Sequence, residues 1–234
     1  MSKVGIVVPV LNNFEQAVGL VQSAKSEKHD IQFYVQPQWL FQIPLAAAWN
    51  HGIQEAFEGG CDYVIVANDD VYLAHWSIDQ MVSDFQLKND KQVILYARDV
   101  YDIIQTPIDM MLEEEGSRDW NSVPVIEDQT FACFMIDKSF FDKVGTFDHN
   151  FDPAWWEDTD MKYRIKLLGY EPLYSSAPYV HFRHQTTKNL TQPLNSQKSG
   201  EYYVKKWGSA RKDLNEAYRL PYNDSSLSPK EWRQ

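Results

Sequence analysis

Short apolar runs alternate with helix-like segments through the first hundred residues, and this alternation limits the chain to few folds. Residues 4–10 form a continuous apolar run, as expected for a strand that is buried on both faces. Apolar residues then recur at helical spacing over residues 14–24. The following predicted elements are strands over 31–35, 62–67 and 93–97 and helices over 45–57 and 78–85. This order predicts an α/β fold in which flanking helices cover a mixed, mostly parallel sheet.

The rest of the chain is less regular. Residues 98–128 interrupt the alternation, and one further strand is predicted over 130–136. Gly145 suits the left-handed residue that ends a short helix. Toward the C-terminus polar residues dominate and the periodicity fades. We therefore predict a single domain over residues 1–185, followed by an extension over 186–234 that packs on this domain or closes over its ligand site.

The formal net charge of −11 is unevenly distributed along the chain. Residues 1–183 contain 13 basic and 28 acidic side chains, whereas residues 184–234 contain 9 basic and 5 acidic ones. An acidic body disfavours electrostatic binding to nucleic acid, so we expect no nucleic-acid partner. The basic extension fits either a solvated helix or a group of cations that neutralise the phosphates of a ligand.

Cysteine usage and the lack of a long apolar run bear on the cellular compartment. Cys61 and Cys133 form neither a CxxC pair nor a disulfide framework, which is typical of a reducing environment. No run approaches the roughly 18 apolar residues of a membrane-spanning helix. The first residues lead directly into a predicted strand rather than a signal peptide. The sequence predicts a cytoplasmic protein without a membrane span, which for a viral protein means the host cytoplasm.

An acidic cluster follows the third predicted strand directly. It consists of Asn68, Asp69 and Asp70, and Asn12 and Gln36 follow earlier strands in the same way. Ligands of such sheets bind beyond the carboxyl ends of the strands. Hard cations such as Mg²⁺ or Mn²⁺ take carboxylate oxygens and keep positions for phosphate. The cluster therefore fits a divalent-metal site for a phosphorylated ligand, and the alternative is an ordinary turn, since Asn and Asp commonly end strands.

A second acidic cluster, residues 157–160 (EDTD), opens a predicted helix that stops at Gly169. Acidic residues in a first helical turn also suit the helix dipole, so capping alone is the alternative. The preceding Trp155 and Trp156 favour a functional role. Aromatic rings bind the faces of sugars and shield a carboxylate from water, which raises its pKa toward that of a useful base.

Two histidines follow a short strand-like stretch near the end of the predicted domain. Either His181 or His184 could complete a metal shell begun by Asp70. A histidine in such a position more often simply packs, so we expect at most one of them to be a ligand.

Motifs of several common enzyme classes are absent from the sequence. It contains no GxxxxGK[ST], GxGxxG, HExxH or GxSxG pattern. The usual P-loop, Rossmann, zincin and serine-hydrolase mechanisms are therefore excluded.

Six short segments occur in the order found in one enzyme family. They are residues 7–13 (VVPVLNN), 46–53 (AAAWNHGI), 68–70 (NDD), 144–148 (VGTFD), 157–160 (EDTD) and 164–170 (RIKLLGY). These segments resemble motifs of the family 2-like glycosyltransferases of GT-A fold. In order, the first four resemble that family's first strand and nucleotide loop, its second helix, its DxD motif and its GGFD turn. The last two together resemble its ED-x-D helix. The resemblance covers about residues 3–185, and the C-terminal segment is similar to that of small viral and phage-type members.

The resemblance implies a metal-dependent glycosyltransferase that moves a hexosyl or deoxyhexosyl group, with inversion, from a nucleotide sugar to a hydroxyl of a glycan or another acceptor. It implies that Asp158 is the general base and that Glu157 belongs to the catalytic pair. The acceptor would lie against Trp155 and Trp156. The implied cofactor is Mn²⁺ or Mg²⁺, bound by Asp70 and His181. The residues implied for the donor are Pro9, Asn12, Asn13, Gln36, Asn50, Asn68 and Asp69, with Lys205, Lys206 or Arg211 near its phosphates.

The sequence departs from the family pattern in two places. Asn68 replaces the first acid of the DxD motif, as in members that resemble rhamnosyltransferases. Residues 36–38 (QPQ) stand where the family usually has an acid that reads the base, which leaves the nucleotide open. A nucleotidyltransferase of related fold would need a Gly-rich, basic first loop, which this chain lacks. The third alternative, motivated by Asn68, is a carbohydrate- or nucleotide-binding module without turnover.

Overall fold

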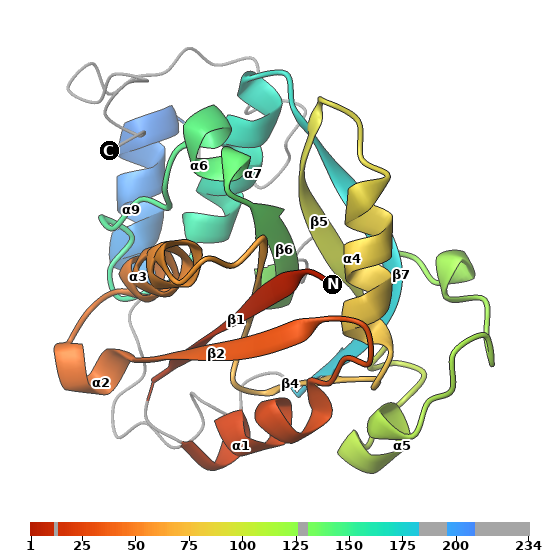
Figure 1. Ribbon diagram of the computed structural model, residues 1–234. Coiled ribbons are helices and arrows are strands. Elements are labelled where there is room, and N and C mark those ends of the chain that lie inside the picture. Colours follow the sequence, from red (N-terminus) through yellow and green to blue (C-terminus); the bar gives the residue numbers. More distant parts are fainter. Residues whose placement is uncertain (12–13, 126–130, 183–195, 209–234) are drawn as a thin grey trace.

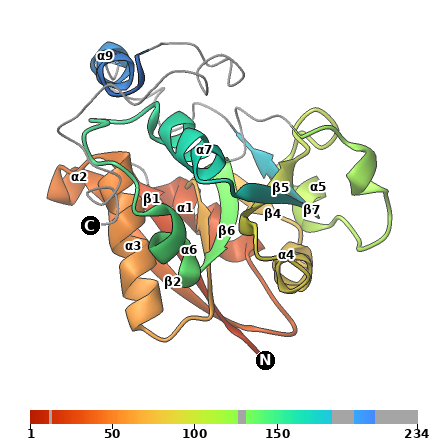
Figure 2. The same ribbon diagram turned by 90° about the horizontal axis from the view of Figure 1, so that it is seen from above.

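A single mixed sheet forms the centre of the molecule, and helices cover both of its faces (Figures 1 and 2). The computed structural model describes residues 1–11, 14–125, 131–182 and 196–208. Its strands are β1 (Lys3–Val10), β2 (Asp30–Pro37), β3 (Tyr63–Ala67), β4 (Val71–Leu73), β5 (Gln92–Asp99), β6 (Cys133–Asp137) and β7 (Glu171–His181). Its helices are α1 (Phe14–Ser23), α2 (Gln38–Phe41), α3 (Leu45–Glu58), α4 (Ser77–Gln86), α5 (Pro107–Met111), the 3₁₀ helix η1 (Trp120–Ser122), α6 (Ser139–Val144), α7 (Glu157–Leu167) and α9 (Ser196–Trp207).

The sheet is mixed but mostly parallel, as predicted. Its strand order is β2-β1-β3-β6-β5-β7-β4. β1 runs parallel to β2 and β3, and β5 runs parallel to β7. β6 is antiparallel to both β3 and β5, and β4 is antiparallel to β7. Only β6 and β4, among the described strands, therefore oppose the common direction, and most strands end at the same edge of the sheet.

Each face of the sheet buries its own apolar core. Because successive strand residues point to opposite faces, Val8 of β1 packs with α1 and α4, whereas Val7 packs with α3, α6 and α7. The two cores contain buried residues from the middle of the sheet as well, such as Ile65 and Val64 of β3. The resulting three layers are the reason why the strands read as continuous apolar runs in the sequence.

Most predicted elements are confirmed, and the misses are short or polar. The strands and helices predicted from residues 4–97 are present, and Gly145 has a φ of 88°, as expected at the end of α6. Three-residue β4 was not predicted, and β7 is far longer than the stretch around residues 178–180 that suggested a strand. Residues 196–207, where the periodicity of the sequence is weak, form α9. Among the described residues, no helix is both long and apolar enough to cross a bilayer.

A tight contact between α3 and the sheet gives a first prediction. An added Cβ on Gly52 would lie 2.4 Å from Val7 Cγ1 and 3.0 Å from Gln36 Cγ. Alanine improves helix propensity over glycine by about 1 kcal/mol, but overpacking a filled core costs about 1–3 kcal/mol. We expect Gly52→Ala to lower the free energy of unfolding in a urea titration, whereas the exposed Gln54→Ala on the same helix leaves it nearly unchanged. A Gly52→Ala protein as stable as the wild type would contradict this packing.

Candidate active site

A pocket of about 230 Å³ lies at the carboxyl ends of β1 and β3. The predicted site residues that line it are Pro9, Asn68, Asp69, Asp70, Trp155, Glu157 and His181. The two acidic clusters, residues 68–70 and 157–160, lie far apart in the sequence, but both contribute side chains to this one cavity. The remaining lining residues, which the sequence did not single out, are Leu11, Gln38, Ile43, Leu45, Pro153 and Ala154.

The first cluster forms the tight turn that connects β3 to β4. The Asn68 backbone N–H donates to the Ala132 carbonyl at 2.9 Å, and its own carbonyl accepts from the Val71 N–H at 3.2 Å. These bonds hold two adjacent carboxylates in place, and Asp69 and Asp70 are only 3% and 5% exposed. Buried carboxylates are stable only when they are paired, hydrogen-bonded or bound to a metal.

The pairing of β4 with β7 brings His181 to this turn. Val71 is the register partner of His181, and the Phe182 N–H donates to the Asp70 carbonyl at 3.0 Å. As a result the Nε2 atom of His181 lies 3.0 Å from Oδ1 of Asp70. The predicted Asp70–His181 pair is thus close in space, whereas His184 lies outside the described residues.

The Asp70–His181 pair fits a divalent cation that is shared with a ligand. Among the described residues, His181 is the one basic side chain within ion-pair distance of Asp70, so no lysine or arginine neutralises this carboxylate there. The described part of the chain contains no group of three or more His, Cys, Asp or Glu side chains able to hold a metal. Mg²⁺-type ions are commonly bound by one or two protein ligands together with substrate phosphates. A two-residue site is therefore suited to a cation whose remaining ligands are phosphate oxygens and water.

Glu157 is the carboxyl group of the second cluster that faces the pocket. It is 5% exposed, and within the described structure its Oε2 atom has no hydrogen-bond partner. Burial, and then the neighbouring carboxylates Asp158 and Asp160, raise the pKa of Glu157 well above its ordinary value. The pocket thus contains a carboxyl group whose surroundings favour the protonated form.

Asp158 has a different environment from Glu157. It is half-buried and is not among the residues that line the pocket. Its Oδ1 atom accepts hydrogen bonds from the backbone N–H of Thr159 at 2.6 Å and from the Thr159 hydroxyl at 3.2 Å. The two adjacent acids of the predicted catalytic pair therefore point into different surroundings.

The two tryptophans before α7 have unusual backbone conformations. Trp155 and Trp156 have φ angles of 70° and 72°, a region that bulky side chains rarely adopt. Such a conformation costs about 1–3 kcal/mol per residue and persists only where surrounding contacts enforce it. The exposed Trp155 ring lines the pocket, but Trp156 instead packs on Tyr203 of α9, with ring centroids 4.9 Å apart. The predicted aromatic wall of the pocket therefore consists of one tryptophan rather than two.

Several predicted donor residues lie away from the pocket lining. Gln36 is buried, and its Nε2 atom donates to Glu55 at 2.6 Å. The Asn50 side-chain amide donates to the Phe147 carbonyl at 2.8 Å, and its oxygen accepts from the Phe147 backbone N–H at 3.0 Å. Asn50 lines a separate depression of about 450 Å³. Asn50 thus fastens the GGFD-like turn to α3. Asn12 and Asn13 lie outside the described residues.

The C-terminal extension contributes α9, but not in the way that its charge suggested. Lys206 is 1% exposed, and its Nζ atom lies 2.7 Å from Asp148 Oδ2 and 2.8 Å from Asp160 Oδ1. Its predicted place near donor phosphates is wrong, because its charge is already paired in the interior. Lys205 is exposed, and Arg211 lies outside the described residues.

Comparisons with known proteins identify solved structures that share this fold. No protein-family profile matches the chain. The catalytic domain of Drosophila β1,4-galactosyltransferase 7, in complex with xylobiose, aligns over 85% of this chain and 78% of its own with a TM-score of 0.56 at 15% identity. A structure of the mutant enzyme with manganese, UDP-Gal and xylobiose gives a TM-score of 0.54 at 14% identity over the same shares. GalNAc-T7 with UDP, GalNAc and Mn²⁺ gives a TM-score of 0.59 at 15% identity over 97% of this chain and 53% of its own. The chain has the GT-A fold.

One curated relative adds a likeness in sequence. A galactofuranosyl glycosyltransferase of Leishmania donovani is 27% identical over 179 residues, which is 61% of this chain. The match spans only 41% of that protein's length. This relative and the two galactosyltransferase structures are named for glycosyl transfer, the broad class of activity that the sequence motifs predicted.

The raised pKa of Glu157 gives a prediction for stability. An unfolded glutamate has a pKa of about 4.3, so above that pH the folded protein binds more protons at this site than the unfolded chain does. Stability must then fall as the pH rises from about 4.3 through the folded pKa. Glu157→Gln removes this loss, and we expect its melting temperature to exceed that of the wild type by an amount that grows between pH 4 and pH 8.

The exposed Glu171→Gln serves as the control for the loss of one carboxylate. If the melting temperatures of Glu157→Gln and the wild type differ by the same amount at pH 4 and pH 8, the assigned environment of Glu157 is wrong.

Proposed function

We propose that this protein is a metal-dependent glycosyltransferase that transfers a sugar from a nucleoside-diphosphate sugar to an acceptor hydroxyl with inversion. The observation that carries the proposal is the meeting of Asp70 and His181 with Glu157 around one pocket of a GT-A fold. Ligand pockets usually measure about 300–1,000 Å³, so the 230 Å³ cavity would take only part of the donor. The rest of the ligands would lie across its open side.

Asp70 and His181 would bind the cation and, through it, the donor diphosphate. A divalent cation bound there would neutralise the charge that develops on the diphosphate. Asp69, which is adjacent to Asp70 and also buried, would contact the donor next to this cation site. Two of the structural neighbours were crystallised with manganese and UDP or UDP-Gal, and the curated relative is named for galactofuranosyl transfer. These likenesses favour UDP-hexoses as the first donors to test.

The two adjacent acids of α7 would divide the chemistry between them. Asp158, half-buried at the start of the helix, would accept the proton of the acceptor hydroxyl. The acceptor oxygen then forms a bond to the anomeric carbon, while the bond from that carbon to the diphosphate oxygen breaks and its electron pair leaves with the diphosphate. Glu157, whose burial favours the protonated form, would donate a hydrogen bond to a sugar oxygen in the pocket. Trp155 would lie against the face of the acceptor.

Metal-dependent donor binding can be measured before any acceptor is known. We expect one nucleotide class, in a panel of UDP-, GDP-, dTDP- and CMP-sugars, to raise the melting temperature with Mn²⁺ or Mg²⁺ but not with EDTA. At 100 times its Kd a ligand adds about 2.7 kcal/mol, which is roughly 5–10 °C for a chain of this size. Asp70→Asn should abolish the shift, whereas Asp90→Asn at an exposed position should keep it. A shift that survives EDTA and Asp70→Asn would contradict the metal site.

Turnover separates the proposed transferase from a binding module. Asn68, in place of the first acid of the motif, favours the binding module as the second candidate. We expect Asp158→Asn to lower kcat about 10²–10⁴-fold while donor binding, measured by calorimetry, changes little. Unchanged turnover would show that Asp158 is not the base, and a wild-type protein that binds a donor but never transfers or hydrolyses it would favour the binding module.

A further inference from the structure

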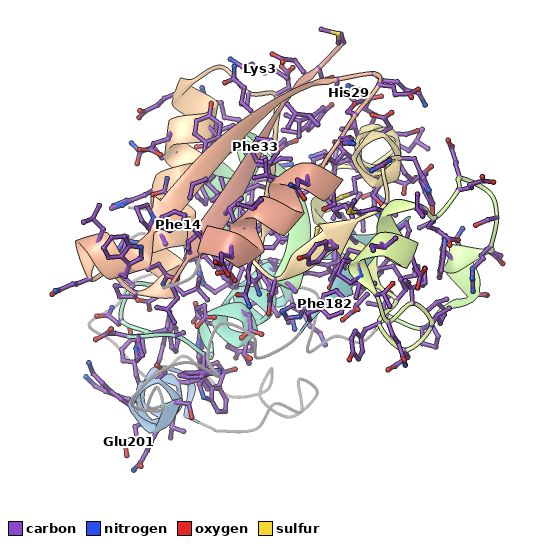
Figure 3. All side chains as sticks on the ribbon, turned by 90° about the horizontal axis from the view of Figure 1, so that it is seen from below. Lys3, Phe14, His29, Phe33, Phe182 and Glu201 are labelled. Atoms are coloured by element: carbon purple, nitrogen blue, oxygen red, sulfur yellow. The ribbon has the colours of Figure 1, made fainter. Side chains whose placement is uncertain are left out.

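Helix α9 lies against α7, on the side of α7 that faces away from the sheet (Figure 2). Tyr163 of α7 and Trp207 of α9 meet edge to face, with ring centroids 4.2 Å apart. The opposite side of α9 is exposed, and Glu201 points outward there (Figure 3). The helix therefore has one buried face, and that face packs on α7, whose first residue, Glu157, lines the pocket.

A buried charge network joins α9 to α7. Both oxygens of Asp160 are engaged: Oδ1 accepts from Lys206 Nζ and Trp207 Nε1, each at 2.8 Å, and Oδ2 accepts from Arg164 Nε at 2.9 Å. Lys206 also binds Asp148 at 2.7 Å. Burial by itself would raise the pKa of Asp148, but the charge and hydrogen bond of Lys206 lower it to about 2. One lysine thus forms ion pairs with two carboxylates from separate parts of the chain.

α9 also contacts the tryptophan segment, which we define as residues 152–157. The Ser199 hydroxyl donates to the Ala154 carbonyl at 2.9 Å. Gly200 allows a close approach, because an added Cβ there would lie 3.2 Å from Trp156 Nε1. The Tyr203 ring also packs on Trp156 at an interplanar angle of 38°. α9 thus contacts the segment in which two bulky residues have positive φ angles.

We infer that α9, with Lys206 as its central positioning residue, holds the tryptophan segment and the first turn of α7 in the conformation that places Trp155 and Glu157 in the pocket. Asp160 lies one helical turn after Glu157, so a contact that fixes Asp160 also fixes the start of α7. The residues proposed for the donor diphosphate and the metal belong to other parts of the chain, the β3–β4 turn and β7. Loss of Lys206 should therefore affect catalysis more than donor binding; this consequence rests on the proposed function, but the placement itself does not.

The test compares Lys206→Met with Glu201→Met in the full chain. Both residues lie on α9, but Lys206 is buried and Glu201 is exposed. At a temperature where circular dichroism shows both proteins folded, we expect Lys206→Met to lower kcat at least tenfold while the donor KM changes less than threefold. Amide hydrogens of residues 155–160 should exchange at least tenfold faster, while those of 64–66 in β3 keep their wild-type rates. Glu201→Met should match the wild type in every measurement.

The outcomes separate this inference from the proposed function. A folded Lys206→Met protein with wild-type kcat and wild-type exchange at residues 155–160 overturns the positioning role. A wild-type protein that transfers no sugar overturns the proposed function, and the exchange comparison then decides the role of α9 alone. If Lys206→Met does not fold, Ser199→Ala takes its place, with about threefold faster exchange at residues 154–157 expected. Wild-type exchange in Ser199→Ala would then overturn the inference.

Discussion

The short antiparallel pairing of β4 with β7 is the constraint on which the candidate site depends. It sets Val71 opposite His181 and thereby places Asp70, one residue earlier, beside the imidazole. A shift of one residue in this register would turn the His181 side chain to the other face of the sheet. β7 is itself held by a long parallel pairing with β5. The position of the proposed metal ligands is therefore set by strand pairing within the sheet.

The buried carboxyl groups around the pocket are stabilised in three different ways. Asp70 has an imidazole beside it, Asp160 is neutralised by Lys206 and Arg164, and Glu157 favours the protonated form. Burying a charge is costly unless it is paired. The acids that hold the structure together are thus the fully paired ones, and those that face the cavity keep the capacity to bind or to exchange a proton.

Much of the fold was predictable because the strands are buried on both faces and therefore read as apolar runs. The closeness of Asp70 and His181 was also predictable, because the family resemblance implied a late histidine beside Asp70. The different surroundings of Glu157 and Asp158 were not, because they depend on the direction in which α7 begins, which the positive φ angles of Trp155 and Trp156 determine. β4 is too short to produce a periodic signal.

The place of Lys206 was predicted wrongly for a related reason. Lys205 and Lys206 look equivalent in the sequence, and a lysine is seldom fully buried. The spacing of Ser199, Tyr203 and Trp207, four residues apart, was the signal that could have revealed α9 and its buried face. Which carboxylates Lys206 would meet depended on tertiary contacts between distant parts of the chain.

The burial of Lys206 also has a consequence for the order in which the protein matures on the ribosome. Chains fold from the N-terminus as they are synthesised, and Asp148 and Asp160 emerge well before residue 206. Until then Asp148, and Asp160 in the first turn of α7, lack the lysine that forms an ion pair with each of them. The sheet can assemble in that interval, but the side of the pocket formed by Trp155 and Glu157 receives the contacts of α9 only when that helix has left the exit tunnel and docked.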